Sequence, residues 1–177
     1  MKRIIISFVI LLFAVTAWGQ SGSTTKSFSW HGLTINYPAN YIITDKEYDR
    51  QNKTYSFICT ITGNDTVSMI AIGFSKKLAK DLSNSLSRKI FFKEIIPATI
   101  SELEPTFKSI KTSDIREYPI PYPNVSVDYT AFVENVEIQG KIVFYIQNDL
   151  LISAVITADS PQYMQELEEI LKSVTIK

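Results

Sequence analysis

The stretch from residue 125 to residue 158 constrains the fold more than any other part of the chain. Apolar residues take every second position over 125–133 and 136–146, which is the period of a β-strand with one buried and one wet face. A third run, 150–158, is apolar at odd and even positions alike, which is typical of a strand covered on two sides. Short polar breaks at Glu134-Asn135 and Asn148-Asp149 separate the runs. The stretch therefore predicts a three-stranded antiparallel meander.

The first third of the chain carries weaker strand signals of the same kind. Residues 33–37 alternate and end at Pro38, which cannot donate to a β-ladder. Residues 55–61 alternate with Ile58 as the exception, and 67–74 are apolar at both parities, as in a central strand. The polar run 45–53 has too little apolar content to pack and is expected to be a solvent loop.

Two regions carry helical signals. Between residues 76 and 108, apolar residues recur every four positions at Leu78, Leu82, Leu86 and Ile90, and Pro97 is expected to kink or divide the helix. The stretch 161–174 reads as a closing helix that Ser160 or Asp159 caps and Pro161 begins. A further strand over 113–117 and an extended connection over 118–123 complete the prediction. Strands with helices packed on them make an α+β domain, a central antiparallel β-sheet flanked by helices, over residues 28–177.

The N-terminal residues have the layout of a secretory signal peptide. Lys2 and Arg3 precede an apolar run from 4 to 17, and small residues then allow cleavage after Ala17 or after Gly19, of which the second is favoured. We expect residues 1–19 to be removed, 20–27 to be a flexible linker, and the mature chain to have no transmembrane segment. A retained signal anchor is the alternative, although the run is short for a bilayer crossing.

The single cysteine and the balanced charge limit the compartment and the class of partner that we expect for the protein. Cys59 has no partner for an internal disulfide, so an exported chain of this kind is expected in a bacterial periplasm or at an outer surface. The chain has 18 basic and 18 acidic residues, and loss of Lys2 and Arg3 leaves 16 basic ones. A chain without basic excess is not expected to bind nucleic acid.

No residue pattern predicts catalysis, a metal or a cofactor. His31 is the only histidine and stands beside Trp30 without partners at ligand spacing, so an incidental surface role is expected. Cys59 shares its strand parity with apolar residues and is expected to be a buried, unreactive thiol. Asp45, Glu47 and Asp49 lack the glycine and the terminal glutamate of a calcium loop. We therefore expect no enzyme; a hydrolase using carboxylates alone is the least favoured hypothesis.

Two binding hypotheses remain. The first is a protein-binding or envelope assembly module that uses the loops 45–53 and 118–123, with Tyr48, Tyr118, Ile120 and Tyr122 as contact residues. The simpler interpretation of 118–123 is a connector whose tyrosines cap the core. The second hypothesis is a carrier of a small apolar ligand, which would lie between the sheet and the helical region around Phe91, Phe92 and Ile95.

Two segments give the chain a family resemblance. Residues 33–41 (LTINYPANY) form an early strand ending in an aromatic-Pro step, and 150–174 combine an apolar strand with a Pro-Gln-Tyr helix start. The order of elements over residues 28–177 resembles the PsbP-like superfamily, which includes an extrinsic photosystem subunit and a Ran-binding import factor. The resemblance implies an α/β/α sandwich that is usually non-catalytic and serves docking or assembly. Photosystem and Ran functions do not transfer, because none of their binding residues is identified here.

Overall fold

The computed structural model describes residues 24–62, 66–133 and 135–176. The strands in this part of the chain are β1 (Thr25–Trp30), β2 (Leu33–Pro38), β3 (Tyr41–Asp49), β4 (Thr54–Ile61), β5 (Ser68–Ser75), β6 (Lys108–Thr112), β7 (Asn124–Val133), β8 (Val136–Gln147), β9 (Leu150–Ala158) and β10 (Thr175–Ile176). The helices are α1 (Lys76–Asp81), α2 (Ser85–Leu103) and α3 (Pro161–Lys172). The predicted signal peptide over 1–19 lies outside the described residues.

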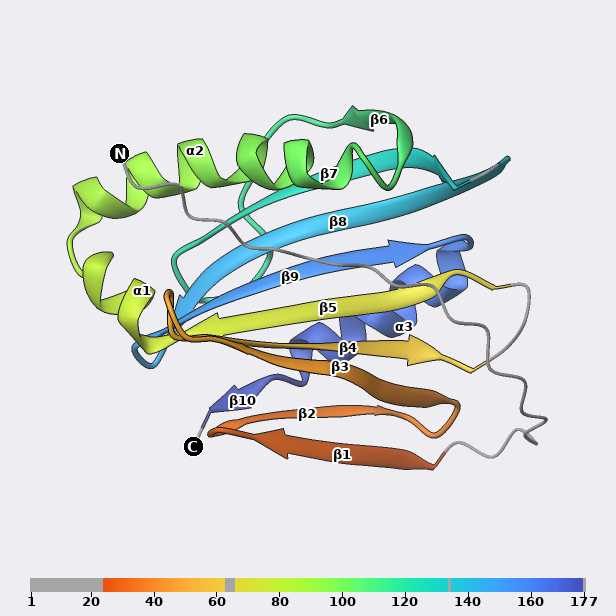
Figure 1. The fold of residues 1–177 in the computed structure, drawn as a ribbon, viewed down its shortest axis with the longest axis horizontal. Coiled ribbons are helices and arrows are strands. Elements are labelled where there is room, and N and C mark those ends of the chain that lie inside the picture. Colours follow the sequence, from red (N-terminus) through yellow and green to blue (C-terminus); the bar gives the residue numbers. More distant parts are fainter. Residues whose placement is uncertain (1–23, 63–65, 134, 177) are drawn as a thin grey trace.

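A seven-stranded antiparallel sheet forms the centre of the molecule, in the order β3-β4-β5-β9-β8-β7-β6 (Figure 1). The predicted meander is confirmed as β7-β8-β9. The strands that were apolar at both parities, β5 and β9, lie side by side in the middle of the sheet, and every residue of β9 is buried. Continuous apolar sequence therefore marked the strands that need cover on two faces.

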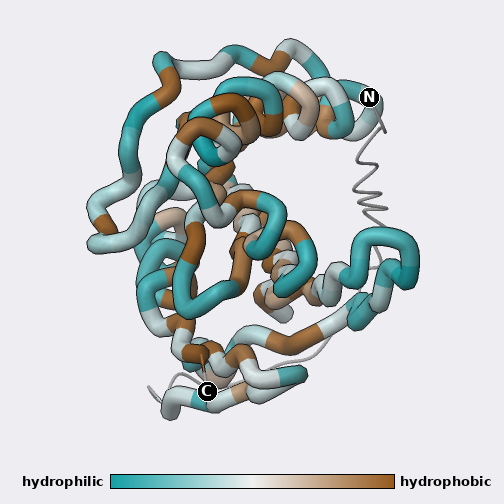
Figure 2. Tube along the Cα trace, turned by 90° about the vertical axis from the view of Figure 1, so that its left-hand side faces the viewer, coloured by the Kyte–Doolittle hydropathy of each residue, from teal (hydrophilic) through white to brown (hydrophobic). Residues whose placement is uncertain are grey.

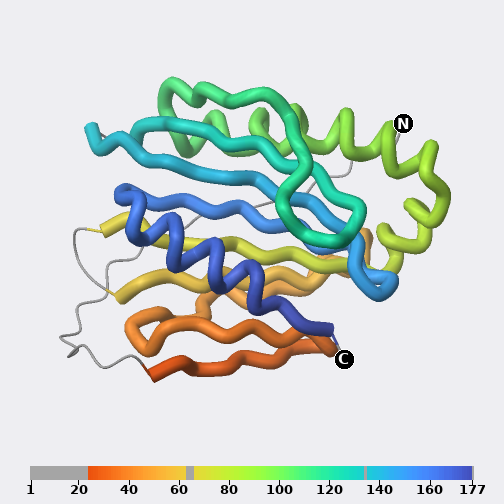
Figure 3. Tube along the Cα trace, turned by 180° about the vertical axis from the view of Figure 1, so that it is seen from behind, coloured from red at the N-terminus to blue at the C-terminus, as the bar shows by residue number. Residues whose placement is uncertain are grey.

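The two long helices cover opposite faces of this sheet. Figure 1 shows α2 in front of β7 and β8, and Figure 3, from behind, shows α3 running diagonally across the other face. A three-stranded sheet, β1-β2-β10, joins α3 on that second face. The chain is therefore an α+β sandwich, as predicted.

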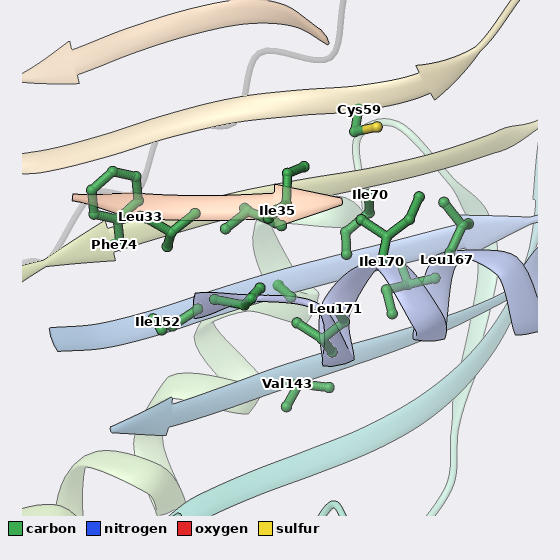
Figure 4. Packing of buried hydrophobic residues seen from close by; sticks show 14 of the residues in the cluster. Leu33, Ile35, Cys59, Ile70, Phe74, Val143, Ile152, Leu167, Ile170 and Leu171 are labelled. Carbon is green, nitrogen blue, oxygen red and sulfur yellow. The ribbon is translucent and has the colours of Figure 1, made fainter. Parts of the chain in front are cut away.

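Each face of the sheet has its own apolar core, and hydrophobic residues concentrate on the central strands (Figure 2). On the α3 face, Leu33 and Ile35 of β2 pack with Leu167, Ile170 and Leu171 of α3 over the strands (Figure 4). The core of the α2 face joins α2 to β7 and β8, with single residues from β4, β5 and β9; its members include Ile95, Ile96, Leu103, Val127, Ala131, Ile138 and Ile142. We use the names α3 face and α2 face for these two sides.

Two features of the meander follow from single residues. Asn148 and Asp149 both have positive φ, 46° and 59°, so the β8–β9 turn uses the left-handed conformation that Asx residues tolerate. Gly140 of β8 pairs with Tyr129 of β7, and a Cβ on this glycine would lie 1.9 Å from the tyrosine ring. The ring lies over the glycine and its hydroxyl contacts the Thr157 hydroxyl at 2.6 Å, so this position requires glycine.

Helix α3 begins as predicted. Ser160 is the N-cap, its Oγ accepts from the Tyr163 backbone N–H at 3.4 Å, and Pro161 occupies the first turn. Leu167, Ile170 and Leu171 are buried against the sheet. The closing helix is therefore confirmed, with these three residues on its buried side.

The prediction for residues 76–108 was wrong about which side of the second helix faces the sheet. The helical region divides at Asn84, whose side chain caps α2 by accepting from the Ser87 N–H at 2.7 Å, and the break restarts the helical phase. Leu82 is buried before the break, whereas Leu86 and Ile90 after it are exposed. Pro97 lies inside α2 without dividing it, and the residues one turn before it, Lys93 and Glu94, are exposed.

Three other expectations need correction. β3 extends to Asp49, so only the end of the predicted loop 45–53 is a turn; β3 is an edge strand, and an edge strand can be charged because it pairs on one side only. β1 likewise begins at Thr25, inside the predicted linker 20–27. The predicted strand over 113–117 is reduced to one bridge, Arg116 with Ser126, and the strand before it is β6.

None of the helices in the described part of the chain has the length and apolar character needed to cross a membrane.

Candidate functional site

The proline-rich segment 118–123 closes on itself rather than running extended. The Asn124 side chain accepts from the Tyr118 backbone N–H at 2.6 Å and donates to the carbonyls of Tyr118 and Tyr122. Tyr118 is 4% exposed, and Ile120 and Tyr122 are half-buried against the α3-face core. The structure therefore favours the connector whose tyrosines cap the core.

The region around Phe91, Phe92 and Ile95 is packed against the sheet. Ile95 is buried, and the Phe91 ring meets Phe144 of β8 edge-on at 6.2 Å between centroids. These residues belong to the α2-face core. Neither of the two grooves described below is lined by them.

Cys59 lies on β4 in the α3-face core, fully buried (Figure 4). Burial raises the pKa of its thiol to about 12, so the thiol stays protonated at neutral pH. The expected burial of the thiol is confirmed. In the part of the chain that the structure describes, no three His, Cys, Asp or Glu side chains come together as a metal site would require.

Tyr48, the fourth predicted contact residue, belongs to a cluster of aromatic rings at one end of the molecule. The Tyr55 ring of β4 lies at its centre, stacked on Tyr48 at 4.6 Å and on His31 at 4.1 Å between centroids. Trp30 meets Tyr55 edge-on at 5.5 Å, and Phe74 of β5 lies beneath at 5.4 Å. Tyr48 is 46% exposed and His31 is also exposed. We call Trp30, His31, Tyr48 and Tyr55 the aromatic end.

Two turns position these rings. The β1–β2 turn has positive φ at His31 (47°) and Gly32 (90°), a two-residue hairpin geometry that brings the His31 ring against Tyr55. In the β3–β4 turn, the Asp49 carboxylate accepts from the backbone N–H of Gln51 and of Asn52. Desolvation would raise the pKa of Asp49, but these bonds and the Asn52 side chain outweigh it and hold the pKa below its ordinary value. Both turns are therefore fixed locally.

The aromatic end combines rigid, flat rings with partial exposure. Tyr and Trp rings supply a large contact area while losing little rotamer freedom, and for this reason they are enriched in binding surfaces. The sequence prediction included Tyr48 but missed Tyr55 and Trp30 and treated His31 as incidental. Trp30-His31-Gly32 was a visible signal, because two rings stand directly before a turn glycine. Their pairing with β3 and β4 depends on tertiary contacts that local patterns do not carry.

A polar groove of about 470 Å³ lies over β6, β7 and β8, beside α3. Lys141 stands at its floor, ion-paired with Glu168 of α3 and with Asp128 of β7, the latter at 3.6 Å. Its Nζ also lies 5.1 Å above the buried Tyr118 ring, and Arg116 pairs with Asp128 from the rim. Lys141, Arg116, Asp128 and Glu168 therefore pair with one another, so these four residues do not offer an unpaired charge to a ligand. Lys111 also lines the groove.

A second groove, about 450 Å³, lies between α3 and β2, and its lining includes the side chains of Asn36, Gln162, Gln165, Glu166 and Glu169. Glu166 at its edge accepts from the Tyr41 hydroxyl at 3.2 Å, and the same hydroxyl contacts Ser68 Oγ at 2.7 Å. Burial raises the pKa of Tyr41 above its ordinary value, with a further contribution from Glu166. The protonated Tyr41 hydroxyl therefore links Glu166 at the groove to the buried Ser68. This arrangement is typical of a structural hydrogen-bond network.

Comparison with solved structures shows similarity to the solution structure of a cyanobacterial PsbP from Synechocystis sp. PCC 6803, with a TM-score of 0.55 and 13% sequence identity. The match covers 92% of this chain and 98% of that one. A protein of unknown function from Pseudomonas aeruginosa is similar at a TM-score of 0.42 and 13% identity, over 84% of this chain and 91% of that one. No family model and no curated protein matches the sequence.

The first comparison agrees with the element order, the central antiparallel sheet and the flanking helices described above. At this level of identity the likeness concerns the fold, and activity and partners do not follow from it. The chain has a PsbP-like fold.

Proposed function

We propose that the protein is an exported, non-catalytic domain that binds a protein partner of the cell envelope through its aromatic end. The observation that carries the proposal is the stack of His31, Tyr55 and Tyr48, whose outer ring is 46% exposed although Phe74 anchors the stack from below. Exposed rings held by neighbouring rings need little further ordering when a partner binds, so less of the contact energy is lost.

The placement of the reactive groups supports a non-catalytic role. The only thiol is buried with a pKa of about 12, and the only imidazole is stacked on Tyr55. The most closely grouped charges, Lys141, Asp128 and Glu168, are occupied with one another. A catalytic group must be free to reach its substrate, whereas the thiol is buried and the grouped charges are engaged with one another.

The apolar-carrier alternative has less support. A carrier needs an enclosed apolar volume, whereas Ile95 and the rings of Phe91 and Phe92 fill the space between α2 and the sheet. Binding through an exposed surface requires no such volume. The docking function is therefore the better conclusion.

Site-specific photo-crosslinking in the producing cell tests the proposal. Benzoylphenylalanine placed at position 48 is expected to give one discrete adduct with an envelope protein, since this position lies on the proposed contact. The same residue at position 132 is the control, because Phe132 has similar exposure (38%) but lies on β7 at the opposite end of the sheet. It is expected to give no such adduct.

A second variant separates docking from chance proximity. His31→Ala removes one ring of the stack and leaves the buried core intact, so the adduct at position 48 is expected to weaken while the melting temperature changes little. Equal adducts at positions 48 and 132, or an adduct at 48 that His31→Ala leaves unchanged, would contradict the aromatic end as the docking site.

A further inference from the structure

The outward side of α2 carries an apolar stripe that the fold does not use. Leu86, Ile90 and Pro97 recur at intervals of four and seven residues and therefore lie on one side of the helix. Leu86 is 67% exposed and Ile90 is 51% exposed, although Ile95, Ile96 and Leu103 already supply the buried side. A helix that only covers a sheet carries polar residues on its outer side, as α3 does.

Basic residues surround this stripe. Residues 76–94 contain six of the 18 basic residues of the chain and only two of its 18 acidic ones, Asp81 and Glu94. Lys93 lies within the stripe and Lys89 beside it, and Lys76, Lys77 and Lys80 are exposed on the adjoining α1. Two of the six are engaged with backbone carbonyls: Arg88 donates to those of Leu82 and Ser83 at the end of α1, and Lys77 donates to that of Gln51.

Cation-flanked aliphatic side chains on a surface helix fit the chemistry of an anionic lipid surface. The aliphatic groups enter the boundary between headgroups and acyl chains, while the lysines remain with the phosphates. Two aliphatic side chains are too few for the core of a stable protein–protein interface, which buries about 800 Å² on each partner. We propose that α1 and the first half of α2 bind the surface of a membrane rich in anionic phospholipids, with Leu86 and Ile90 inserted.

This membrane contact is independent of the aromatic end, because it uses other elements and another class of partner. α1 and the start of α2 lie at the same end of the sheet as the turn 50–53, which contacts the start of α1 through the Lys77 Nζ bond to the Gln51 carbonyl at 3.1 Å (Figure 1). A chain bound to lipid through α2 therefore holds the aromatic end near the membrane. Loss of one contact leaves the other measurable.

The buried Cys59 makes a site-resolved test possible, because a single new surface cysteine can be labelled selectively. An environment-sensitive fluorophore attached to Ile90→Cys is expected to shift to the blue on addition of vesicles that contain phosphatidylglycerol, and to show no shift with phosphatidylcholine alone. The same label on Val136→Cys is the control, since Val136 is also 51% exposed but lies on β8. Because the reading is local, it does not depend on residues 1–19.

Charge and apolar variants complete the test. Lys89→Gln with Lys93→Gln is expected to weaken vesicle binding about 25-fold, at roughly fivefold for each lysine near an anionic surface. Leu86→Ser in the Ile90→Cys chain is expected to weaken it by a similar factor. A label at position 90 that does not respond, that responds as position 136 does, or that responds unchanged after Leu86→Ser would overturn the proposal. Capture of an acidic protein without any vesicle response at position 90 would overturn it as well.

Discussion

Helices α2 and α3 cover opposite faces of one sheet, yet they differ in the residues on their exposed sides. In α3 the buried side chains are apolar, and the exposed ones include Gln162, Gln165, Glu169 and Lys172. In α2 the buried side is equally apolar, but the exposed side adds Leu86 and Ile90. The sequence of α3 is explained by packing on the sheet alone, whereas the sequence of α2 is not.

The two helices show which apolar side chains stabilise the fold and which are available for binding. Apolar side chains buried on either helix hold the sandwich together, and their loss leaves cavities. Apolar side chains on the outer side of α2 contribute little to folding, because they are wet in the folded state. Substitutions on the two sides of α2 should therefore divide cleanly into those that change unfolding and those that change binding.

The largest expected effect tests this division directly. Ile170→Ala on the buried side of α3 and Ile96→Ala on the buried side of α2 should each lower the free energy of unfolding by about 2–5 kcal/mol, since both residues are 1% exposed. Ile90→Ala should change it by less than about 0.5 kcal/mol. Urea denaturation followed by circular dichroism measures all three. A loss at Ile90 comparable to that at Ile96 would show that the outer side of α2 is buried in the working protein.

A medium effect, of about 1 kcal/mol, is expected from the titration of Cys59 on the α3 face. Burial raises the folded-state pKa of the thiol from 9.0 to about 12, so its contribution to stability is complete below pH 9 and is lost as the pH rises toward 12. Wild type should accordingly lose about 1 kcal/mol more than Cys59→Ala between about pH 8 and pH 10. Parallel pH curves for the two proteins would contradict the burial of a protonated thiol.

Thiol alkylation gives an independent reading of the same group. Native protein should react with iodoacetamide far more slowly than urea-unfolded protein, because the nucleophile is the thiolate and the folded core excludes both the charge and the reagent. Ile170→Ala, which loosens the cover over this face, should react faster than Ile90→Ala. Equal rates in the two variants would argue that α3 does not protect Cys59.

Much of the fold could be predicted because the decisive signals are local. The alternation in β7 and β8, the double-sided apolar runs of β5 and β9, and the Ser160-Pro161 start of α3 each follow from neighbouring residues. The phase of α2 could not be predicted in this way, because the four-residue spacing from Leu78 to Ile90 continues across the cap at Asn84. β10 was missed because its two residues gain strand geometry only by pairing with β2.

The candidate site was less predictable than the fold. Tyr118 stood out in the sequence because of the prolines around it, but its burial depends on how the Asn124 side chain closes the loop. The sequence placed Tyr55 only as one residue of an alternating strand. The stacking of its ring on Tyr48 and His31 depends on the registers of β3 with β4 and of β1 with β2. Site geometry here comes from long-range pairing, which residue spacing does not determine.

The smallest expected effect is the difference in stability between variants that lack the N-cap of α2 and variants that lack the N-cap of α3. Asn84 accepts from the Ser87 N–H at 2.7 Å, whereas Ser160 accepts from the Tyr163 N–H at 3.4 Å, near the limit for a hydrogen bond. Asn84→Ala should therefore lower the free energy of unfolding by about 1 kcal/mol and Ser160→Ala by about 0.5 kcal/mol. Because the Asn84 cap also holds the turn that carries Leu86, its loss should weaken the vesicle response of a label at position 90, and Ser160→Ala should leave that response unchanged. Equal vesicle responses after both substitutions would mean that the first turn of α2 does not present the membrane contact.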